Sequence, residues 1–186
     1  MAHIFDINHM QKLDSPQRRK LMPPLETLKR LGLKSADTVA DIGCGIGYFT
    51  KPAAEIVKDN KVYALDPSSE MLEWLTTHSE AKNIVPVKTT DYDFTIEDAQ
   101  ISFALLANVL HEIDDKSRFI KEIKRILKPN SRLAVIEWQK KEAKMGPDSA
   151  HRISTSELNS LLSEYFKQEY ITDISGEFYG AVYSLV

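Results

Sequence analysis

Residues 39–50 read VADIGCGIGYFT, and this stretch decides the fold. The apolar segment at 38–42 is typical of a buried strand, and a helical pattern runs over 48–57. Between them Gly43, Gly45 and Gly47 predict a turn, because glycine tolerates positive φ and lets a ligand approach the backbone. Amide groups at the start of the following helix can donate to that ligand. The order strand, glycine turn and helix therefore predicts a ligand-binding loop.

An acidic side chain follows the next expected strand, at 61–65. Asp66 lies 19 residues after Gly47, and a carboxylate there can accept hydrogen bonds from both hydroxyls of a ribose. The glycine turn and this acid together predict an adenosine site. A dinucleotide fingerprint, G-x-G-x-x-G, would place glycine at position 48, where this chain has Tyr48. S-adenosylmethionine has no phosphate and does not need that glycine, so the spacing favours it over a dinucleotide.

Strand and helix patterns alternate along the rest of the chain. A helix is expected at 68–78, and another follows Asp115 and stops at Pro129. Residues 154–157 match a capping box that opens a further helix. Further strands are expected at 83–88, 101–107, 132–138, 166–172 and 177–185. This pattern predicts an α/β, Rossmann-like, doubly wound and mostly parallel seven-stranded sheet, with one antiparallel strand from a C-terminal hairpin.

Length and composition narrow the class of protein. A chain of 186 residues suits one domain, with residues 1–24 as an N-terminal helical cover and 25–186 as the α/β core. The net charge of −3 provides no chain-wide basic field for nucleic acid. The single cysteine, Cys44, excludes an intrachain disulfide and a multi-cysteine metal site. Without a long apolar run or an export signal, we expect a cytoplasmic protein, a monomer or homodimer, without membrane insertion.

Several motifs carry a resemblance to a known family. Residues 41–47, 62–68, 103–112 and 127–133 resemble motifs of the class I S-adenosylmethionine-dependent methyltransferases. The resemblance covers roughly residues 25–140 and is strongest to the small-molecule branch with ubiquinone/menaquinone and arsenite methyltransferases. It implies S-adenosylmethionine as cofactor and a small-molecule acceptor. The cofactor-binding residues that it implies are Asp41, Gly43, Gly45, Gly47, Asp66, Pro67, Met71, Asp91, Tyr92 and Asn108.

The chain departs from two branches of that family. Arsenite methyltransferases rely on several cysteines, whereas this chain has one. The D/N-P-P-Y/F motif of amino-directed nucleic-acid methyltransferases is absent from the sequence. These differences argue against arsenite and nucleic-acid acceptors.

Fewer residues are candidates for chemistry on the acceptor. His111 follows the fourth expected strand, and an imidazole pKa near 6.5 suits proton removal at neutral pH; a packed histidine is the other reading. Glu137 and Arg152 are candidate substrate contacts, whereas Trp138 is assigned to the core. Two segments are candidate covers, at 13–20 and 139–152. The second contains cations that would favour an anionic or electron-rich acceptor, and solvated surface lysines are the other interpretation: Lys140, Lys141, Lys144, His151 and Arg152.

Three functions remain open at this point. The first is methyl transfer from S-adenosylmethionine to a small molecule. The second is a nicotinamide-dependent oxidoreductase, although Tyr48 and the lack of a Tyr-x-x-x-Lys pair argue against it. The third is a non-catalytic protein that binds S-adenosylmethionine.

Overall fold

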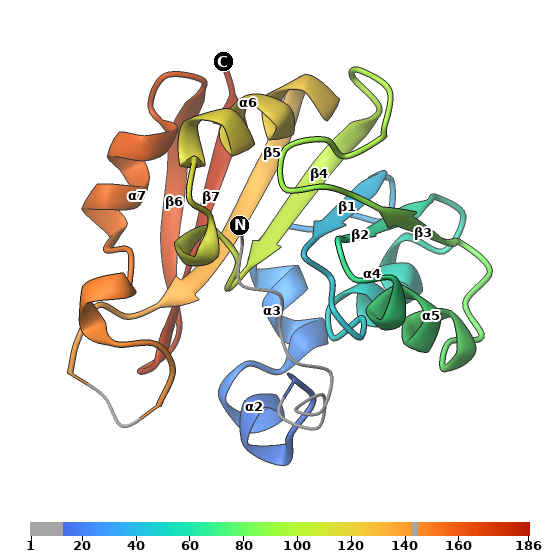
Figure 1. Cartoon of the computed structure of the whole chain (residues 1–186), viewed down its shortest axis with the longest axis horizontal. Helices are drawn as coiled ribbons and strands as arrows, with labels where there is room; N and C mark the ends of the chain where they lie inside the picture. The colour runs from blue at the N-terminus through green and yellow to red at the C-terminus, as the bar shows by residue number, and fades with distance from the viewer. Residues whose placement is uncertain (1–12, 143–144) are drawn as a thin grey trace.

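The computed structural model describes residues 13–142 and 145–186, and it contains one seven-stranded sheet (Figure 1). The strand order is β3-β2-β1-β4-β5-β7-β6. Strand β7 runs antiparallel to both of its neighbours, and the other pairings are parallel. The strands are β1 (Val39–Ile42), β2 (Val62–Asp66), β3 (Ile84–Lys88), β4 (Ile101–Ala107), β5 (Leu127–Trp138), β6 (Phe166–Ser175) and β7 (Phe178–Leu185). The predicted α/β architecture with one reversed strand is confirmed.

Helices cover both faces of the sheet. Apolar residues of α6 and α7 pack on one face, and those of α3 and α4 pack on the other. The predicted caps are confirmed, because Asp115 accepts the Arg118 amide and Ser154 forms a capping box with Glu157. The helices are α2 (Pro16–Leu21), α3 (Pro24–Arg30), α4 (Thr50–Val57), α5 (Ser69–Thr77), η2 (Leu110–Glu112), α6 (Lys116–Ile126), η3 (Ser149–His151) and α7 (Thr155–Leu162).

The boundary between α6 and β5 differs from the prediction. The helix ends at Ile126 instead of Pro129, and the strand starts at Leu127 instead of position 132. A proline disfavours helical geometry at the preceding residue, so the helix must end before Lys128. Leu127 then pairs with Ile101, and the parallel ladder resumes at Arg132 after a shift in register. The intervening Asn130 has a φ of +61°.

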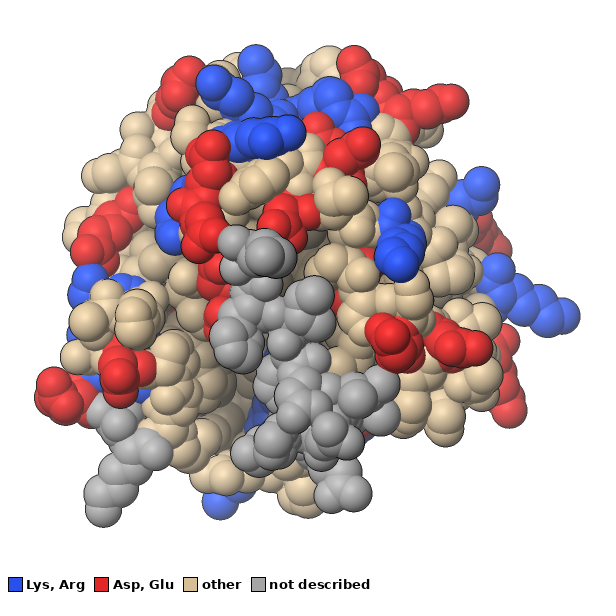
Figure 2. All heavy atoms as spheres, viewed as in Figure 1, with Lys and Arg blue, Asp and Glu red and all other residues tan. Residues whose placement is uncertain are grey.

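The carboxyl ends of β1, β2, β4 and β5 meet at one edge of the sheet, where ligands bind in folds of this kind. In Figure 1 this edge faces α2 and the loop that follows β5. Basic and acidic side chains are interspersed on the face shown in Figure 2, with several Lys and Arg at its upper rim. Among the described residues, no helix has the length and apolarity needed to span a membrane.

Candidate active site

A cavity of about 810 Å³ lies at this edge of the sheet. The glycine turn after β1 and the ends of β2, β4 and β5 form its floor and sides. Residues of the N-terminal segment 13–21 and of the segment 145–147 close it from two sides. The two closing segments contact each other, since the Gln17 amide lies 3.0 Å from the Met145 sulfur. Both candidate covers therefore reach the cavity with part of their length; residues 1–12 and 143–144, including Lys144, lie outside the described residues.

The three glycines of the turn have different roles. All have positive φ, at +73° for Gly43, +52° for Gly45 and +83° for Gly47. Gly43 and Gly45 line the cavity, and a Cβ at Gly43 would lie 2.5 Å from a methyl group of Val109. Gly47 does not line it; a Cβ there would collide with Leu75 of α5. Gly47 thus permits close packing of the turn against a helix, and its expected contact with a cofactor is not supported by its position.

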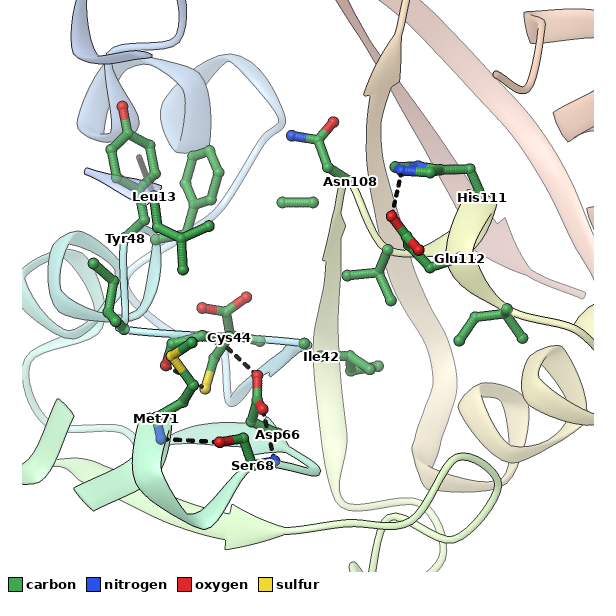
Figure 3. Close-up of a pocket in the computed structure, with 18 of the residues that line it drawn as sticks. Leu13, Ile42, Cys44, Tyr48, Asp66, Ser68, Met71, Asn108, His111 and Glu112 are labelled. Carbon is green, nitrogen blue, oxygen red and sulfur yellow. Dashed lines mark hydrogen bonds and ion pairs between the residues drawn. The ribbon is translucent and has the colours of Figure 1, made fainter. Parts of the chain in front are cut away.

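Asp66 closes the glycine turn from the end of β2. Its carboxylate accepts the Gly45 amide at 2.8 Å and the Ser68 amide at 2.9 Å, one on each oxygen (Figure 3). Burial raises the pKa of Asp66 above its usual value, against the lowering effect of these two bonds. Each carboxylate oxygen has a second acceptor position, so two donors of a ligand can still bind. The carboxylate lines the cavity and fits the pair of hydroxyls on a ribose.

Asp41 is a second buried carboxylate in the cavity. It is 3% exposed, and the Thr50 hydroxyl donates to it at 2.6 Å. Burial raises the pKa of Asp41 to about 6, and the nearby charge of Asp66 adds to the increase, whereas Thr50 and Arg18 oppose it. Two acidic groups in one cavity favour a ligand that carries positive charge. S-adenosylmethionine carries a sulfonium and an ammonium group, and it fits this set of acceptors.

Arg18 is a cavity residue that sequence reasoning did not single out. It lies in α2, donates to the Leu13 carbonyl at 2.8 Å and places its guanidinium 4.3 Å from the centre of the Tyr48 ring. The Tyr48 hydroxyl in turn donates to the Met22 carbonyl at 2.8 Å. Burial lowers the pKa of Arg18 from its usual value. Tyr48, at the position where a dinucleotide fingerprint has glycine, therefore anchors the N-terminal segment at the cavity. Its ring also holds the Arg18 guanidinium there, a cation that suits a carboxylate.

The other expected cofactor residues divide into two groups. Pro67, Met71, Asp91 and Asn108 line the cavity with Asp66, as expected. Tyr92 does not, because its hydroxyl accepts the Asp115 amide at 3.1 Å and Arg118 lies over its ring. Tyr92 thus joins the start of α6 to the loop after β3, and its expected contact with the cofactor stays a prediction.

Asn108 occupies a strained position at the end of β4. Its φ is +59°, a region where asparagine is enriched among residues with a side chain. Its buried side-chain oxygen has no hydrogen-bond partner among the described residues, and the residue lines the cavity. A buried acceptor without a partner costs free energy unless a ligand donates to it. This oxygen is therefore a position for an amino or hydroxyl group of a bound molecule.

His111 lies in η2, just after β4, and both of its ring nitrogens face carboxylates. Nδ1 is 2.7 Å from Glu137, and Nε2 is 3.3 Å from Glu112, which lies beside the ring in Figure 3. Glu137 is completely buried and also accepts the His111 amide at 3.3 Å. Burial opposes charge on the ring, but the bond to Glu137 and the charges of both glutamates outweigh it and raise the pKa of His111. The ring is held rigidly at the cavity wall.

The two expected substrate residues, Glu137 and Arg152, do not line the large cavity. Glu137 lies behind His111, as described above. Arg152 is 2% exposed, and it donates to the carbonyl oxygens of Gln139 and Pro147, each at 2.9 Å, and to that of Met145. Glu137 therefore contacts His111, and its expected contact with a substrate stays a prediction. Arg152 instead holds the loop after β5 in place.

Several aromatic side chains line the cavity, and the sequence did not predict this role for them. Trp138 was assigned to the core, but it is half-buried, lines the cavity and packs 4.2 Å from the ring of Phe178. Gly146 packs closely against Trp138, because a Cβ at position 146 would lie only 2.8 Å from the indole ring. Tyr48 and Phe49 line the cavity as well. The signal for Trp138 was available, because it ends β5 at the same edge of the sheet as Asp66.

Comparison with known proteins agrees with this geometry. A family described as "Methyltransferase domain" matches residues 40–135, just over half of the chain. The chain is 29% identical over 118 residues to the 2-phytyl-1,4-naphtoquinone methyltransferase of Trichormus variabilis, which covers 61% of this chain and 52% of that protein. It is also 29% identical over 119 residues to the ubiquinone/menaquinone biosynthesis C-methyltransferase of Hahella chejuensis, with coverages of 61% and 48%. The chain thus spans about half the length of these curated relatives.

Solved structures extend the similarity to the whole fold. A S-adenosylmethionine-dependent methyltransferase of Aquifex aeolicus superimposes with a TM-score of 0.92 at 29% identity, covering 98% of this chain and 100% of that one. A protein of Sulfolobus solfataricus described as a type 11 methyltransferase has a TM-score of 0.70 at 27% identity, covering 80% and 83%. The similarity therefore includes the elements that surround the cavity.

Proposed function

The chain belongs to the class I S-adenosylmethionine-dependent methyltransferases, and from that premise we propose that it methylates a small molecule whose reacting group must lose a proton. One observation carries this proposal. A single cavity has a cofactor-type glycine turn with Asp66 on one side and a rigidly held histidine, His111, on the other. The opposed placement suits a methyl donor on the first side and an acceptor on the second.

The cofactor supplies a methyl group bonded to a positively charged sulfur, a good leaving group. Asp66 would accept hydrogen bonds from its ribose hydroxyls, and Met71 would lie against its adenine. Asp41 and the Asn108 oxygen are acceptors for its ammonium group, and Arg18 is a donor to its carboxylate. The N-terminal segment, held by Tyr48, would exclude water from above the turn. The protein thus contributes orientation and exclusion of water, and leaves the reactivity to the cofactor.

His111 is the proposed base for the acceptor. Glu137 accepts a hydrogen bond from Nδ1–H in the neutral ring, so Nε2 carries the lone pair, and Glu112, 3.3 Å from Nε2, would stabilise a proton taken up there. Nε2 would take the proton of the acceptor, and the bound cofactor would supply the methyl group to the electron pair that this leaves on the acceptor. The products are the methylated acceptor, S-adenosylhomocysteine and a proton that His111 passes to solvent. Glu137 acts through His111 and is a positioning residue.

The acceptor side of the cavity favours a compact molecule with an aromatic or apolar body. Leu21, Phe49, Trp138 and Phe178 line the cavity and belong to one apolar cluster, which we assign to the acceptor. Two relatives are named as a 2-phytyl-1,4-naphtoquinone methyltransferase and a ubiquinone/menaquinone biosynthesis C-methyltransferase, and these names support an acceptor of similar character. A cavity of about 810 Å³ must hold cofactor and acceptor together, so a folded macromolecule does not fit inside it.

Calorimetry with S-adenosylhomocysteine tests the cofactor half of the proposal. We expect saturable binding at micromolar concentration. In a separate assay with labelled S-adenosylmethionine and a panel of phenols, we expect a labelled methylated product. No binding at millimolar concentration would exclude the proposed activity. Binding without labelled product across a broad metabolite pool would favour the non-catalytic alternative.

The pH dependence tests the base. Only neutral His111 can accept a proton, and its pKa is raised above the usual 6.5, so kcat/KM should rise with pH through a midpoint above 6.5. Well below the midpoint the decrease is about tenfold per pH unit. The profile is measured at saturating cofactor, because Asp41 titrates near pH 6 in the same cavity.

A variant of the positioning residue sharpens this test. Glu137→Gln keeps an oxygen for Nδ1–H but removes the carboxylate charge, so the midpoint should move to lower pH. Glu169→Gln, on the outer strand β6, is the matched control and should leave the profile unchanged. A profile that is identical in both variants would exclude His111 as the titrating base.

A further inference from the structure

A second cavity, of about 660 Å³, adjoins the proposed active site. The N-terminus of α6, the end of the loop after β5, and α7 surround it, and these elements lie side by side in Figure 1. Among the described residues, His111 is the one that lines both cavities. The second cavity therefore begins at the ring that the proposed function assigns as base.

Arg152 contacts residues of both cavities. It lines the second cavity, and its guanidinium donates to the carbonyl oxygens of Met145 and Pro147, whose residues line the first. Its charged group also lies 5.3 Å from the Trp138 ring of the first cavity. One buried side chain thus holds residues of the first cavity in place and belongs to the lining of the second.

The charge of the second cavity is positive. Lys116, Lys140 and Arg152 line it, whereas Glu157 is the single carboxylate in its lining among the described residues. Glu157 is already paired with Lys140 at 2.7 Å. Lys116 donates to the Ile113 carbonyl at 2.6 Å, and the exposed His151 also lines the cavity. The cations of the 139–152 loop that suggested an anionic acceptor are thus partly gathered here, whereas Lys141 pairs with Glu177 outside this lining.

Arg152 has no carboxylate partner among the described residues. Its bonds go to three carbonyl oxygens, which use three of the five N–H groups of a guanidinium. A buried charge without a counter-charge is costly, and a planar carboxylate matches the geometry of a guanidinium. An anionic group in the second cavity would offset that cost and would place the rest of its molecule beside His111.

We propose that the second cavity is an anion subsite, which binds a carboxylate group of the acceptor through Arg152, Lys116 and His151. The acceptor then extends past His111 into the first cavity, where its reacting group meets the methyl donor. This inference rests on the proposed function and names the substrate class more closely, as small aromatic carboxylates. His111 lines both cavities, and Arg152 lines the second cavity and donates hydrogen bonds to residues that line the first.

Matched acids and amides test the subsite. The probes are 4-hydroxybenzoate, 4-hydroxyphenylacetate and 4-hydroxycinnamate, each compared with its own neutral amide, on protein saturated with S-adenosylhomocysteine. Calorimetry at low ionic strength should show at least one acid that binds about tenfold more tightly than its amide. The three lengths cover different distances between the carboxylate and the ring.

Substitutions in the second cavity test which residues cause the preference for the acid over its amide. Lys116→Gln and His151→Gln should each reduce the acid preference about threefold or more, while the affinity of the amide stays constant. Arg152→Lys keeps the charge but not the planar geometry, and it should reduce the preference further, provided that its unfolding temperature matches the parent. Lys141→Gln, in the same loop but paired with Glu177, is the control and should keep the full preference.

The outcomes separate the two proposals. Equal affinities for every acid and its amide, or no binding of any acid, would overturn the subsite while leaving the methyltransferase function intact if S-adenosylhomocysteine still binds. A preference that survives in Lys116→Gln, His151→Gln and Arg152→Lys would also overturn it. Loss of S-adenosylhomocysteine binding by the parent protein would instead overturn the proposed function itself.

Discussion

Replacing His111 by asparagine should reduce kcat by about 10²–10⁴-fold, the usual contribution of a positioned general base. The asparagine amide can still donate to Glu137, so the buried carboxylate keeps a partner. What the variant loses is the basic Nε2 at the cavity wall. The rate is measured as labelled methyl transfer to an acceptor found with the parent protein.

Binding measurements make this result specific. The affinity of His111→Asn for S-adenosylhomocysteine should stay within about twofold of the parent, because Asp41, Asp66 and the glycine turn are untouched. His78→Asn, on an exposed histidine at the end of α5, is the control and should keep full activity. A His111→Asn enzyme that retains its rate within about threefold would show that the acceptor reacts without a base from this residue.

The second large effect is expected at Asp66. Asp66→Ala should weaken S-adenosylhomocysteine binding by about 10–100-fold, since hydrogen bonds to charged groups contribute about 1.5–3 kcal/mol. The carboxylate also holds the Gly45 and Ser68 amides, so its loss loosens the turn that contacts the ligand. Calorimetry gives the affinity, and thermal unfolding of the free protein reports any loss of stability.

Asp59 provides a matched control. It is exposed and lies before β2, at the opposite end of the strand from Asp66. Asp59→Ala should leave the affinity unchanged, whereas Asp66→Asn, which retains one acceptor oxygen, should fall between Asp66→Ala and the parent. An Asp66→Ala protein with parental affinity would mean that the ribose does not bind at this carboxylate.

Local sequence patterns were sufficient for most of the fold. The buried apolar runs of β1 and β4 and the caps at Asp115 and Ser154 depend on neighbouring residues, and their positions were predicted. The start of β5 was missed, because Leu127 enters the sheet by pairing with Ile101, a residue far away in the chain. A helix cap can be predicted from residues close in sequence, whereas the pairing partner of a strand cannot be predicted from the residues of that strand.

Local sequence patterns were enough to predict the fold class, the reversed strand and most of the cavity residues expected at the cofactor. These features rest on a strand, a turn and a helix that are contiguous in the chain, and on an acid at the end of the next strand. Most of the residues expected at the cofactor line the cavity for this reason. Gly47 and Tyr92 are the exceptions, since contacts with other elements decide which way they face.

The proposed acceptor side depends on contacts between residues that are far apart in the chain. His111 and Glu137 are 26 residues apart, and Gln17 and Met145 are 128 apart, yet each pair is in contact. Hydrogen bonds between distant residues pair Glu137 with His111, the proposed base, and tie Arg152 to the loop after β5. Residue types and spacing cannot specify such contacts, because they arise only when separate strands and loops meet at one edge of the sheet.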